Sequence, residues 1–459
     1  MKKKDVEMTD FSLAFTDKKI TPWSGLALLK RLGDRLGFFE HLSEIGLPEP
    51  GSNRGYKPEQ LITQLLISVW CGANRYEHCE VTRLDETLAG IFGIKRMAGH
   101  RAISRLFGKF GQGLCKSVFD RWYSWMFEQL KIGSLTLDLD STVMTRFGLK
   151  QEGAVKGYNP KNPGRNSHHP LLAFVADTQM VANIWLRPGN AHTANNGVAF
   201  LENTLSRLGS KNCELLRADS GFAEEPFFKA VEAKGLHYTI ALRLNQPLQR
   251  ALNSIERAWW PLEEEGGHGI ELCQFDYKAA AWGQARRVVG IRQHLKTRPT
   301  AKGKQLSLFA DDEVVGSWRY SAIVTDMDLP ALMVWRLYRG RADCENRIKE
   351  LKYDFGSTGF NQKNFWATEA ALATIMMGFN LMSLLRKLLL KKQPLHTLKT
   401  LRYKLFGVAG YIVKTGRQKI LTMAMNMRRR AWFSGLWEQS KNFDYPVSFA
   451  PIFIMPSPP

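Results

Sequence analysis

The chain has 459 residues, with 64 Lys and Arg against 43 Asp and Glu, which gives a formal net charge of +21. A hydrophobic content of 44% is typical of a globular protein and excludes a disordered polycation. The length predicts about two to four domains. The positive excess predicts a polyanionic partner, and nucleic acid is the commonest one; a membrane surface is the alternative.

Further classes of protein are excluded by missing signals. The start, Met1–Asp5, runs into acidic and polar residues, so no secretory segment is expected. The uncharged run Ala370–Leu385 falls short of the roughly 20 apolar residues of a membrane span, and we expect a buried amphipathic helix there. The six cysteines form no C-x-x-C, which excludes a zinc ribbon and predicts a reducing, cytoplasmic compartment. No phosphate-binding P-loop is present, which argues against an ATP-driven motor.

Residues 1–130 are predicted to be mostly helical. Leucines recur at helical spacing after Thr21, and a second apolar helix is expected over Pro58–Trp70. A helix over His100–Phe110 places Arg101 and Arg105 on one face. Such a basic stripe is typical of the recognition helix of a helix-turn-helix, although an ordinary solvated helix face has the same pattern.

From about residue 132 the hydrophobic period changes to two, which predicts strands. The expected order is βββαβαβ, with elements over 134–143, 171–176, 182–186, 195–208, 214–218, 225–234 and 237–244. Residues 245–325 are predicted to be an inserted, mostly β segment with strands at Leu272–Tyr277, Arg287–Ile291 and Tyr320–Val324. One long helix is then expected from Asp328 to about Tyr353. The tail from 386 to 459 holds 14 Lys or Arg and 2 acidic residues.

Two carboxylates stand at predicted strand ends. Asp140 lies on the polar face of the first strand, and Asp219 ends the fourth strand. In an open sheet such side chains point into the crevice where ligands bind. Either one alone is usually a cap or a turn former, but two on neighbouring strands favour a metal site. Asp138 shares the face of Asp140 and stays an alternative to it, because a period of two cannot separate them.

The long predicted helix supplies a third acid. At about 100° per residue, Glu345 shares one face, roughly 80° wide, with a phenol and three cations. These are Tyr338, Arg341, Lys349 and Lys352. The other acids, Asp343 and Glu350, fall on the far side. An ordinary exposed helix with several i,i+4 ion pairs would show the same pattern.

Three converging carboxylates repel one another unless cations neutralise them, and an all-oxygen ligand set suits Mg²⁺ or Mn²⁺. Two such ions about 3.5–4 Å apart can clamp the attacking and leaving oxygens of a phosphodiester. The sequence therefore predicts that Asp140, Asp219 and Glu345 bind two Mg²⁺, which Mn²⁺ can replace. The neighbouring cations would hold backbone phosphates without reading sequence.

The spacing Tyr338-x₂-Arg341-x₃-Glu345-x₆-Lys352 resembles the Tyr-Arg-Glu-Lys signature of one large group of bacterial insertion-sequence transposases of the DDE type. The segments Leu139–Thr142 and Ala218–Phe222 are similar to the two Asp motifs of that group, and the acids are 79 and 126 residues apart. Three further segments resemble insertion-sequence family 1380. They are Gly157–Pro160, Ser167–Leu171 and Arg187–His192.

This resemblance implies an α/β fold with a ribonuclease-H-like catalytic core, a β-rich insertion and a helical N-terminal DNA-binding domain. The implied boundaries are 1–130 for the DNA-binding domain, 131–244 and 326–390 for the core, 245–325 for the insertion and 391–459 for a basic C-terminal region. It also implies a transposase that binds terminal inverted repeats, cleaves the transposon ends and joins their 3′-hydroxyls to target DNA. The expected form is a homodimer on double-stranded DNA, in the bacterial cytoplasm at the nucleoid and not at a membrane.

The DNA contacts are assigned to eight side chains. Four lie around the third acid, namely Tyr338, Arg341, Lys349 and Lys352. Lys156 and Arg165 lie in a Gly/Pro/Asn-rich loop after the first strand, and Arg101 and Arg105 on the N-terminal helix. Two alternatives remain: a metal-dependent nuclease of the same fold without strand transfer, and a catalytically silent DNA-binding protein derived from a transposase.

Overall fold

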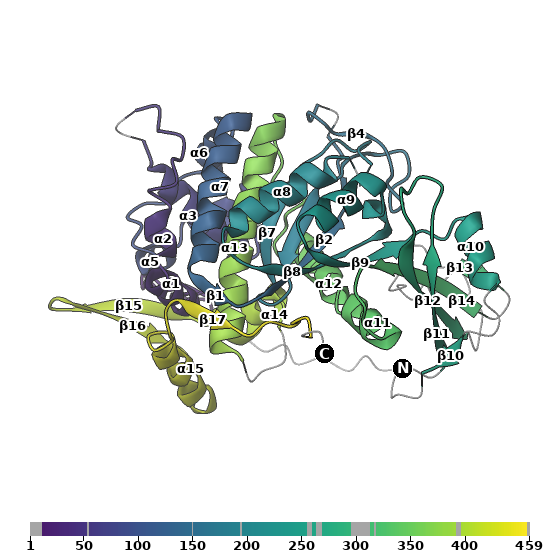
Figure 1. Cartoon of the computed structure of the whole chain (residues 1–459). Helices are drawn as coiled ribbons and strands as arrows, with labels where there is room; N and C mark the ends of the chain where they lie inside the picture. Colours follow the sequence, from purple (N-terminus) through teal and green to yellow (C-terminus); the bar gives the residue numbers. More distant parts are fainter. Residues whose placement is uncertain are drawn as a thin grey trace, which may run out of the picture.

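The computed structural model describes residues 12–52, 55–148, 150–192, 195–254, 259–262, 269–294, 313–315, 318–391 and 396–456. Its centre is a mixed sheet, ten strands wide over these residues, in the order β10-β11-β12-β14-β9-β8-β2-β6-β7 with β13 beside β14. Figure 1 shows helices on both sides of this sheet. The α/β class expected from the sequence is therefore confirmed.

The middle of the sheet has the βββαβαβ order that the sequence predicts. Its members are β2 (Leu135–Ser141), β6 (Leu171–Val175), β7 (Met180–Trp185), α8 (Gly197–Leu208), β8 (Cys213–Ala218), α9 (Glu225–Ala233) and β9 (His237–Leu242). β8 runs parallel to both β2 and β9, whereas β6 is antiparallel to β2. Every residue of β2 except the last is buried, as expected for a strand in a sheet whose two faces are both covered.

The predicted β-rich insertion continues this same sheet. It contains α10 (Gln246–Asn253), β10 (Trp260–Pro261), β11 (Ile270–Tyr277), β12 (Arg286–His294), β13 (Glu313–Val315) and β14 (Trp318–Thr325). The three strands predicted there are confirmed. β14 pairs antiparallel with β9, so the added strands extend the sheet at one edge.

The N-terminal part is helical, as predicted. It consists of α1 (Leu26–Arg35), α2 (Phe38–His41), α3 (Pro58–Cys71), α4 (Cys79–Arg83), α5 (Glu86–Ile91), α6 (His100–Phe107) and α7 (Gln112–Glu128), with a 3₁₀ turn at Tyr76–His78. These helices surround α13 (Phe365–Leu389), which lies beside α7 and β7 in Figure 1. One large hydrophobic core contains side chains from Leu26 to Val447, and a second, smaller cluster packs the helix Ala331–Arg339 against the sheet.

The expectation that the apolar C-terminal helix is amphipathic is wrong. α13 is buried on nearly its whole circumference, from Ala367 to Leu389. Its length and composition alone would let it cross a membrane, but nearly all of the apolar stretch is buried inside the protein. A helix that is hydrophobic all round can be the centre of a large core, and α13 has that role here.

The prediction of a single long helix from Asp328 to Tyr353 is also wrong. The chain forms two helices there, α11 (Ala331–Arg339) and α12 (Ala342–Tyr353). The Nη1 of Arg217 donates to the carbonyl of Leu337 at 2.8 Å, and the N–H of Arg341 bonds to Tyr338 at 2.9 Å instead. A Cβ at Gly340 would lie 2.4 Å from that guanidinium nitrogen, so a larger residue there would displace the Arg217 side chain.

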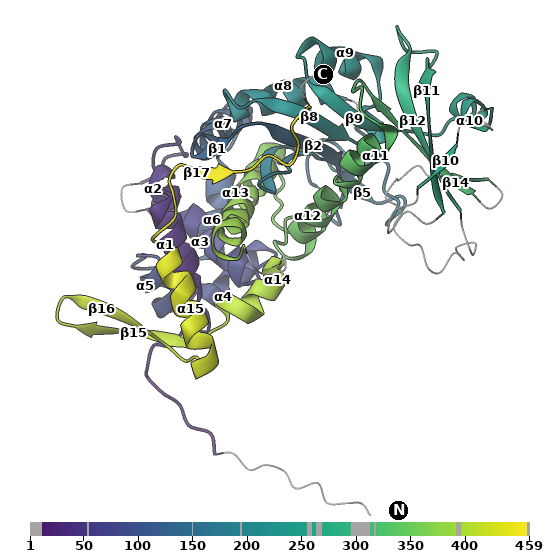
Figure 2. The same ribbon diagram turned by 60° about the horizontal axis from the view of Figure 1, so that its bottom comes forward.

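The basic C-terminal region wraps back over the molecule. It contains α14 (Leu398–Leu401), a π-helical turn (Arg402–Phe406), β15 (Gly410–Thr415), β16 (Gln418–Met423), α15 (Met427–Gln439) and β17 (Val447–Phe449). β17 pairs parallel with β1 (Leu130–Ile132), which ties the chain end to the start of the sheet. Figure 2 shows that β15 and β16 project away from the body.

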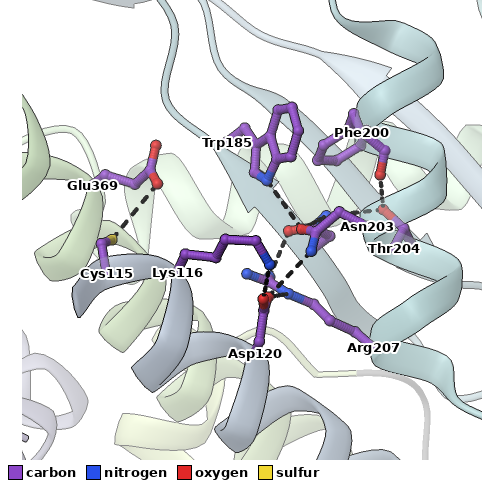
Figure 3. A network of polar contacts seen from close by, with 10 residues as sticks. Cys115, Lys116, Asp120, Trp185, Phe200, Asn203, Thr204, Arg207 and Glu369 are labelled. Carbon is purple, nitrogen blue, oxygen red and sulfur yellow. Dashed lines mark hydrogen bonds and ion pairs between the residues drawn. The ribbon is translucent and has the colours of Figure 1, made fainter. Parts of the chain in front are cut away.

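A buried polar network joins the N-terminal helices to the sheet (Figure 3). Asp120 on α7 pairs with Arg207 on α8 at 2.7 Å, and Lys116 pairs with the same carboxylate. The Arg207 side chain is only 5% exposed, also donates to Asn183, and lies 4.9 Å from the ring centre of Tyr123. A buried guanidinium of this kind depends on its carboxylate for charge compensation.

We expect Asp120→Ala to lower the free energy of unfolding by about 3–5 kcal/mol, because Arg207 is left buried without its carboxylate. Lys116→Ala removes the exposed partner of the same carboxylate and should cost less than about 1 kcal/mol. Urea unfolding of both variants measures the difference. Equal losses would contradict the assignment of Arg207 as the buried partner.

Candidate active site

Asp140 and Asp219 lie side by side at the ends of two parallel strands. The register pairs Leu139 of β2 with Ala218 of β8, and each Asp is the next residue along its strand. Asp219 then opens a 3₁₀ turn, Ser220–Phe222, and accepts a hydrogen bond from the N–H of Gly221 at 3.2 Å. The predicted position of the two acids on neighbouring strands is confirmed.

Arg341, at the break between α11 and α12, connects these acids to Glu345. Its Nη2 lies 2.8 Å from Oδ2 of Asp140, and its Nη1 lies 3.7 Å from Oε1 of Glu345. The Arg341 side chain is only 5% exposed. Burial by itself would lower the pKa of Arg341, but the charges of Asp140 and Asp219 keep that pKa well above its usual value. The guanidinium thus serves as the counter-charge of the site.

The carboxylates themselves are only partly compensated. Burial raises the pKa of Asp140, and Arg341 opposes that shift. Burial likewise raises the pKa of Glu345, with Arg341 acting in the opposite direction. Raised values mean that the folded protein carries these negative charges at a cost. An additional cation at this position would lower that cost.

Tyr338 and the lysines complete the surroundings. Burial raises the pKa of the Tyr338 phenol; the charge of Arg341 opposes this shift, and the charges of Asp219, Asp140 and Glu345 add to it. Lys352 donates to the carbonyl of Val143, just after β2, at 2.9 Å. Lys349 is half-buried one turn after Glu345 and lowers the pKa of that carboxyl.

The competing acids are engaged elsewhere. Asp138 forms a bidentate ion pair with Arg217, at 2.6 Å and 2.8 Å, and both side chains are buried. Asp343 pairs with Arg347 at 3.4 Å, and Glu350 pairs with Arg347 at 3.0 Å as well as with Arg386. Of Asp138 and Asp140, which the sequence left open, Asp140 is the one that contacts Arg341.

The ligand chemistry of the three carboxylates fits Mg²⁺, which prefers hard oxygen ligands. Within the described residues, however, no three His, Cys, Asp or Glu side chains are close enough to hold one ion together. The guanidinium of Arg341 contacts both Asp140 and Glu345 instead. Binding of one ion by all three acids would therefore require them to move closer together.

The histidines near the site are not metal ligands in this arrangement. His168 accepts from Nε of Arg146 at 2.9 Å and donates to the carbonyl of Glu152, and burial lowers its pKa to about 4. His169 contacts the hydroxyl of Ser141 at 3.1 Å, directly beside Asp140. Both imidazoles orient the segment that follows β2.

The loop predicted after the first strand is a small three-stranded sheet over the described residues, β3 (Met144–Thr145), β5 (Asn166–His168) and β4 (Val155–Lys156). Lys156 and Arg165 are exposed on it. Arg101 and Arg105 are exposed on α6, within the helical part and on a different element from the acids. The structure thus brings together the residues around Glu345 and leaves these four cations on the surface.

Two buried arginines near the site were missed by the sequence reasoning. Arg217 pairs with Asp138, and Arg187 donates from Nε to the carbonyl of His169 at 2.9 Å. Asp219 raises the pKa of Arg187 against the larger lowering by burial. The signal for Arg217 was present: a cation within the apolar strand Leu215–Ala218 must find an acid on the neighbouring strand.

Residues 3–442 match the family model "Transposase DDE domain group 1". The chain belongs to this family. No curated protein matches it. Among solved structures it is similar, at 12% identity and a TM-score of 0.43, to a cryo-EM structure of a piggyBac transposase synaptic complex with hairpin DNA, over 84% of this chain and 79% of that one. Membership of the DDE transposase family supports a transposase role for the chain.

We expect Asp138→Asn to destabilise the fold more than Asp140→Asn. Loss of the Asp138 charge leaves Arg217 buried without its carboxylate and should cost about 3–5 kcal/mol. Asp140→Asn also removes a carboxylate from a buried guanidinium, but Arg341 keeps Glu345 at 3.7 Å and burial of the Asp140 charge is itself costly, so the loss should be smaller. Thermal unfolding of both variants compares them directly. An equal or larger loss for Asp140→Asn would contradict this difference.

Proposed function

We propose that this chain is an insertion-sequence transposase with a ribonuclease-H-like core. It binds terminal inverted repeats, cleaves the transposon ends and joins the 3′-hydroxyls to target DNA. The observation that supports this most is that Arg341 contacts both Asp140, at one strand end, and Glu345, on α12, while Asp219 lies at the adjacent strand end. The Tyr-Arg-Glu-Lys spacing and the resemblance to insertion-sequence family 1380 point the same way.

In this proposal Asp140, Asp219 and Glu345 hold two Mg²⁺, and Mn²⁺ can substitute. Ions bound there would activate the attacking oxygen and stabilise the leaving oxygen of a phosphodiester. The raised pKa values of Asp140 and Glu345 support this, because a bound cation relieves the cost of their buried charge.

The side chains around the acids position the DNA strand. Arg341, freed from one carboxylate, donates to a phosphate near the scissile bond, since its guanidinium can bind two oxygens at once. Lys349 and Lys352 lie one and two turns after Glu345 on α12 and neutralise the next phosphates. The Tyr338 phenol donates a hydrogen bond and does not act as a base, because its pKa is raised.

The exposed cations further out bind flanking duplex. Arg101 and Arg105 on α6 contact the terminal repeat, and Lys156 and Arg165 contact the strand that enters the site beside β2. Two copies of the chain are expected to hold two transposon ends together as a homodimer on double-stranded DNA. These contacts are electrostatic and weaken as salt is raised.

A strand-transfer assay tests the proposal. Purified protein with Mg²⁺, DNA carrying the inverted repeats that flank the coding region, and a target plasmid should give joined product. We expect Glu345→Gln to reduce the rate about a thousand-fold, which corresponds to ~4 kcal/mol of transition-state stabilisation. Asp343→Asn is the matched control on the same helix and should act within a few-fold of the wild type.

The assay also separates the alternatives. Hydrolysed ends without joined product would assign the chain to metal-dependent nucleases of the same fold. Full activity of Glu345→Gln would contradict the assigned site, and DNA binding without any cleavage by the wild type would favour a silent, transposase-derived DNA-binding protein.

A pH profile tests the role of Lys352. Burial lowers the pKa of Lys352 to about 8, so its ammonium is present below that pH and lost above it. We expect kcat/KM for cleavage to fall as pH rises through about 8, because this parameter reports the free protein. Lys352→Arg keeps its charge and should flatten the alkaline limb. An unchanged limb would exclude Lys352 as its origin.

A further inference from the structure

One feature of the C-terminal region plays no part in the catalytic site. Strands β15 and β16 form an isolated hairpin, here called the C-terminal arm (residues 410–423), and within the described residues no third strand pairs with it. Its loop is Gly416-Arg417, and the φ of +59° at Gly416 suits the tight two-residue turns that favour glycine. Figures 1 and 2 both show the arm projecting from the helical part beside α5.

The root of the arm is firmly attached. Thr21 and Gly410 exchange backbone hydrogen bonds at 2.8 and 2.9 Å. Lys18 stacks on the ring of Tyr411, with Nζ 3.2 Å from the ring centre. The Cδ1 of Ile412 lies 3.3 Å from the place that a Cβ at Gly90 of α5 would take. The body of the protein therefore sets the direction in which the arm points.

The residues at the tip of the arm destabilise the hairpin when it stands alone in water. Val413 and Ile420 face each other across the strands, 38% and 47% exposed. Lys414 lies directly opposite Lys419, and like charges in that position destabilise a hairpin. A two-stranded hairpin without further strands is only marginally stable in water. An arm of this composition therefore indicates a partner that supplies negative charge and covers apolar surface.

The cations of the tip are available to such a partner. The side chains of Lys414, Arg417 and Lys419 are exposed, and within the described part of the chain none forms a hydrogen bond or ion pair. Arg428, at the start of α15, is exposed as well. The sequence contains no Asp or Glu between Glu369 and Glu438, so no acidic side chain of this stretch competes for them.

We propose that the C-terminal arm grips duplex DNA away from the three carboxylates. This rests on the proposed function and adds to it a second DNA contact. A two-stranded ribbon fits the major groove of B-DNA, where cations at the tip reach phosphates on both sides. The exposed pair of Val413 and Ile420 packs on the apolar edges of the bases or on the sugars. A second copy of this strongly basic chain is a poorer partner, because its net charge of +21 repels the tip.

The test uses the full chain and a fluorescent duplex of random sequence, about 40 base pairs long, with anisotropy measured from about 50 to 300 mM KCl. The arm variant carries Lys414→Ser, Arg417→Ser and Lys419→Ser. The matched control carries Lys131→Ser, Lys234→Ser and Lys278→Ser, three exposed cations elsewhere that change the net charge equally.

For the arm variant we expect the affinity for DNA to fall about ten- to a hundred-fold near 0.1 M salt. The slope of log K against log salt concentration should become shallower by about 2–3, because each lost phosphate contact removes roughly 0.9 from it. The control should change neither quantity appreciably. The double variant Val413→Ser, Ile420→Ser should weaken binding without changing the slope.

Other outcomes would overturn the inference. An arm variant that binds DNA as the control does would exclude the arm as a DNA contact. If the wild type sediments as a dimer and the arm variant as a monomer, the arm contacts a second copy of the chain instead. Cleavage and strand transfer by the wild type in either case would leave the proposed function intact. A wild type that binds no duplex at any salt would contradict the proposed function itself.

Discussion

The buried ion pair between Asp138 and Arg217 is the constraint on which the geometry of the site depends. It joins β2 to β8, and the same guanidinium also donates to the carbonyl of Leu337, in the last turn of α11. Just beyond that turn Arg341 lies against Asp140. One buried ion pair thus connects the two strands that position Asp140 and Asp219 to the helix end that precedes Glu345.

Around this frame the protein separates structural from functional charge. Arg217 and Arg386 are buried and paired with Asp138 and Glu350, and their loss would leave an uncompensated charge in the core. The carboxylates near Arg341 are different, because burial raises the pKa of Asp140 and Glu345 despite the nearby guanidinium. Each of these acids also pairs with the buried Arg341, so its charge costs desolvation and at the same time compensates that guanidinium. A site whose charges are costly without a cation is well suited to receive one.

Other cations lie on the surface and are spread over several elements. Arg101 and Arg105 stand on α6, Lys156 and Arg165 on the small sheet after β2, and further cations on the C-terminal arm. Exposed cations of this kind contribute little to folding, because water and salt screen them. Their value is in binding a long polyanion at several points at once, and the net charge of +21 is best understood in this way.

The sequence by itself determined the βββαβαβ order and the two Asp residues at adjacent strand ends, and helical spacing placed Glu345 on a different face from Asp343 and Glu350, because hydrophobic period and local spacing are short-range properties. It could not separate Asp138 from Asp140, since both share one strand face. Only the tertiary structure shows their different partners: Arg217, far along the chain, pairs with Asp138, and Asp140 lies beside Arg341. A buried charge selects its partner by proximity in the folded core, and that proximity is absent from the linear chain.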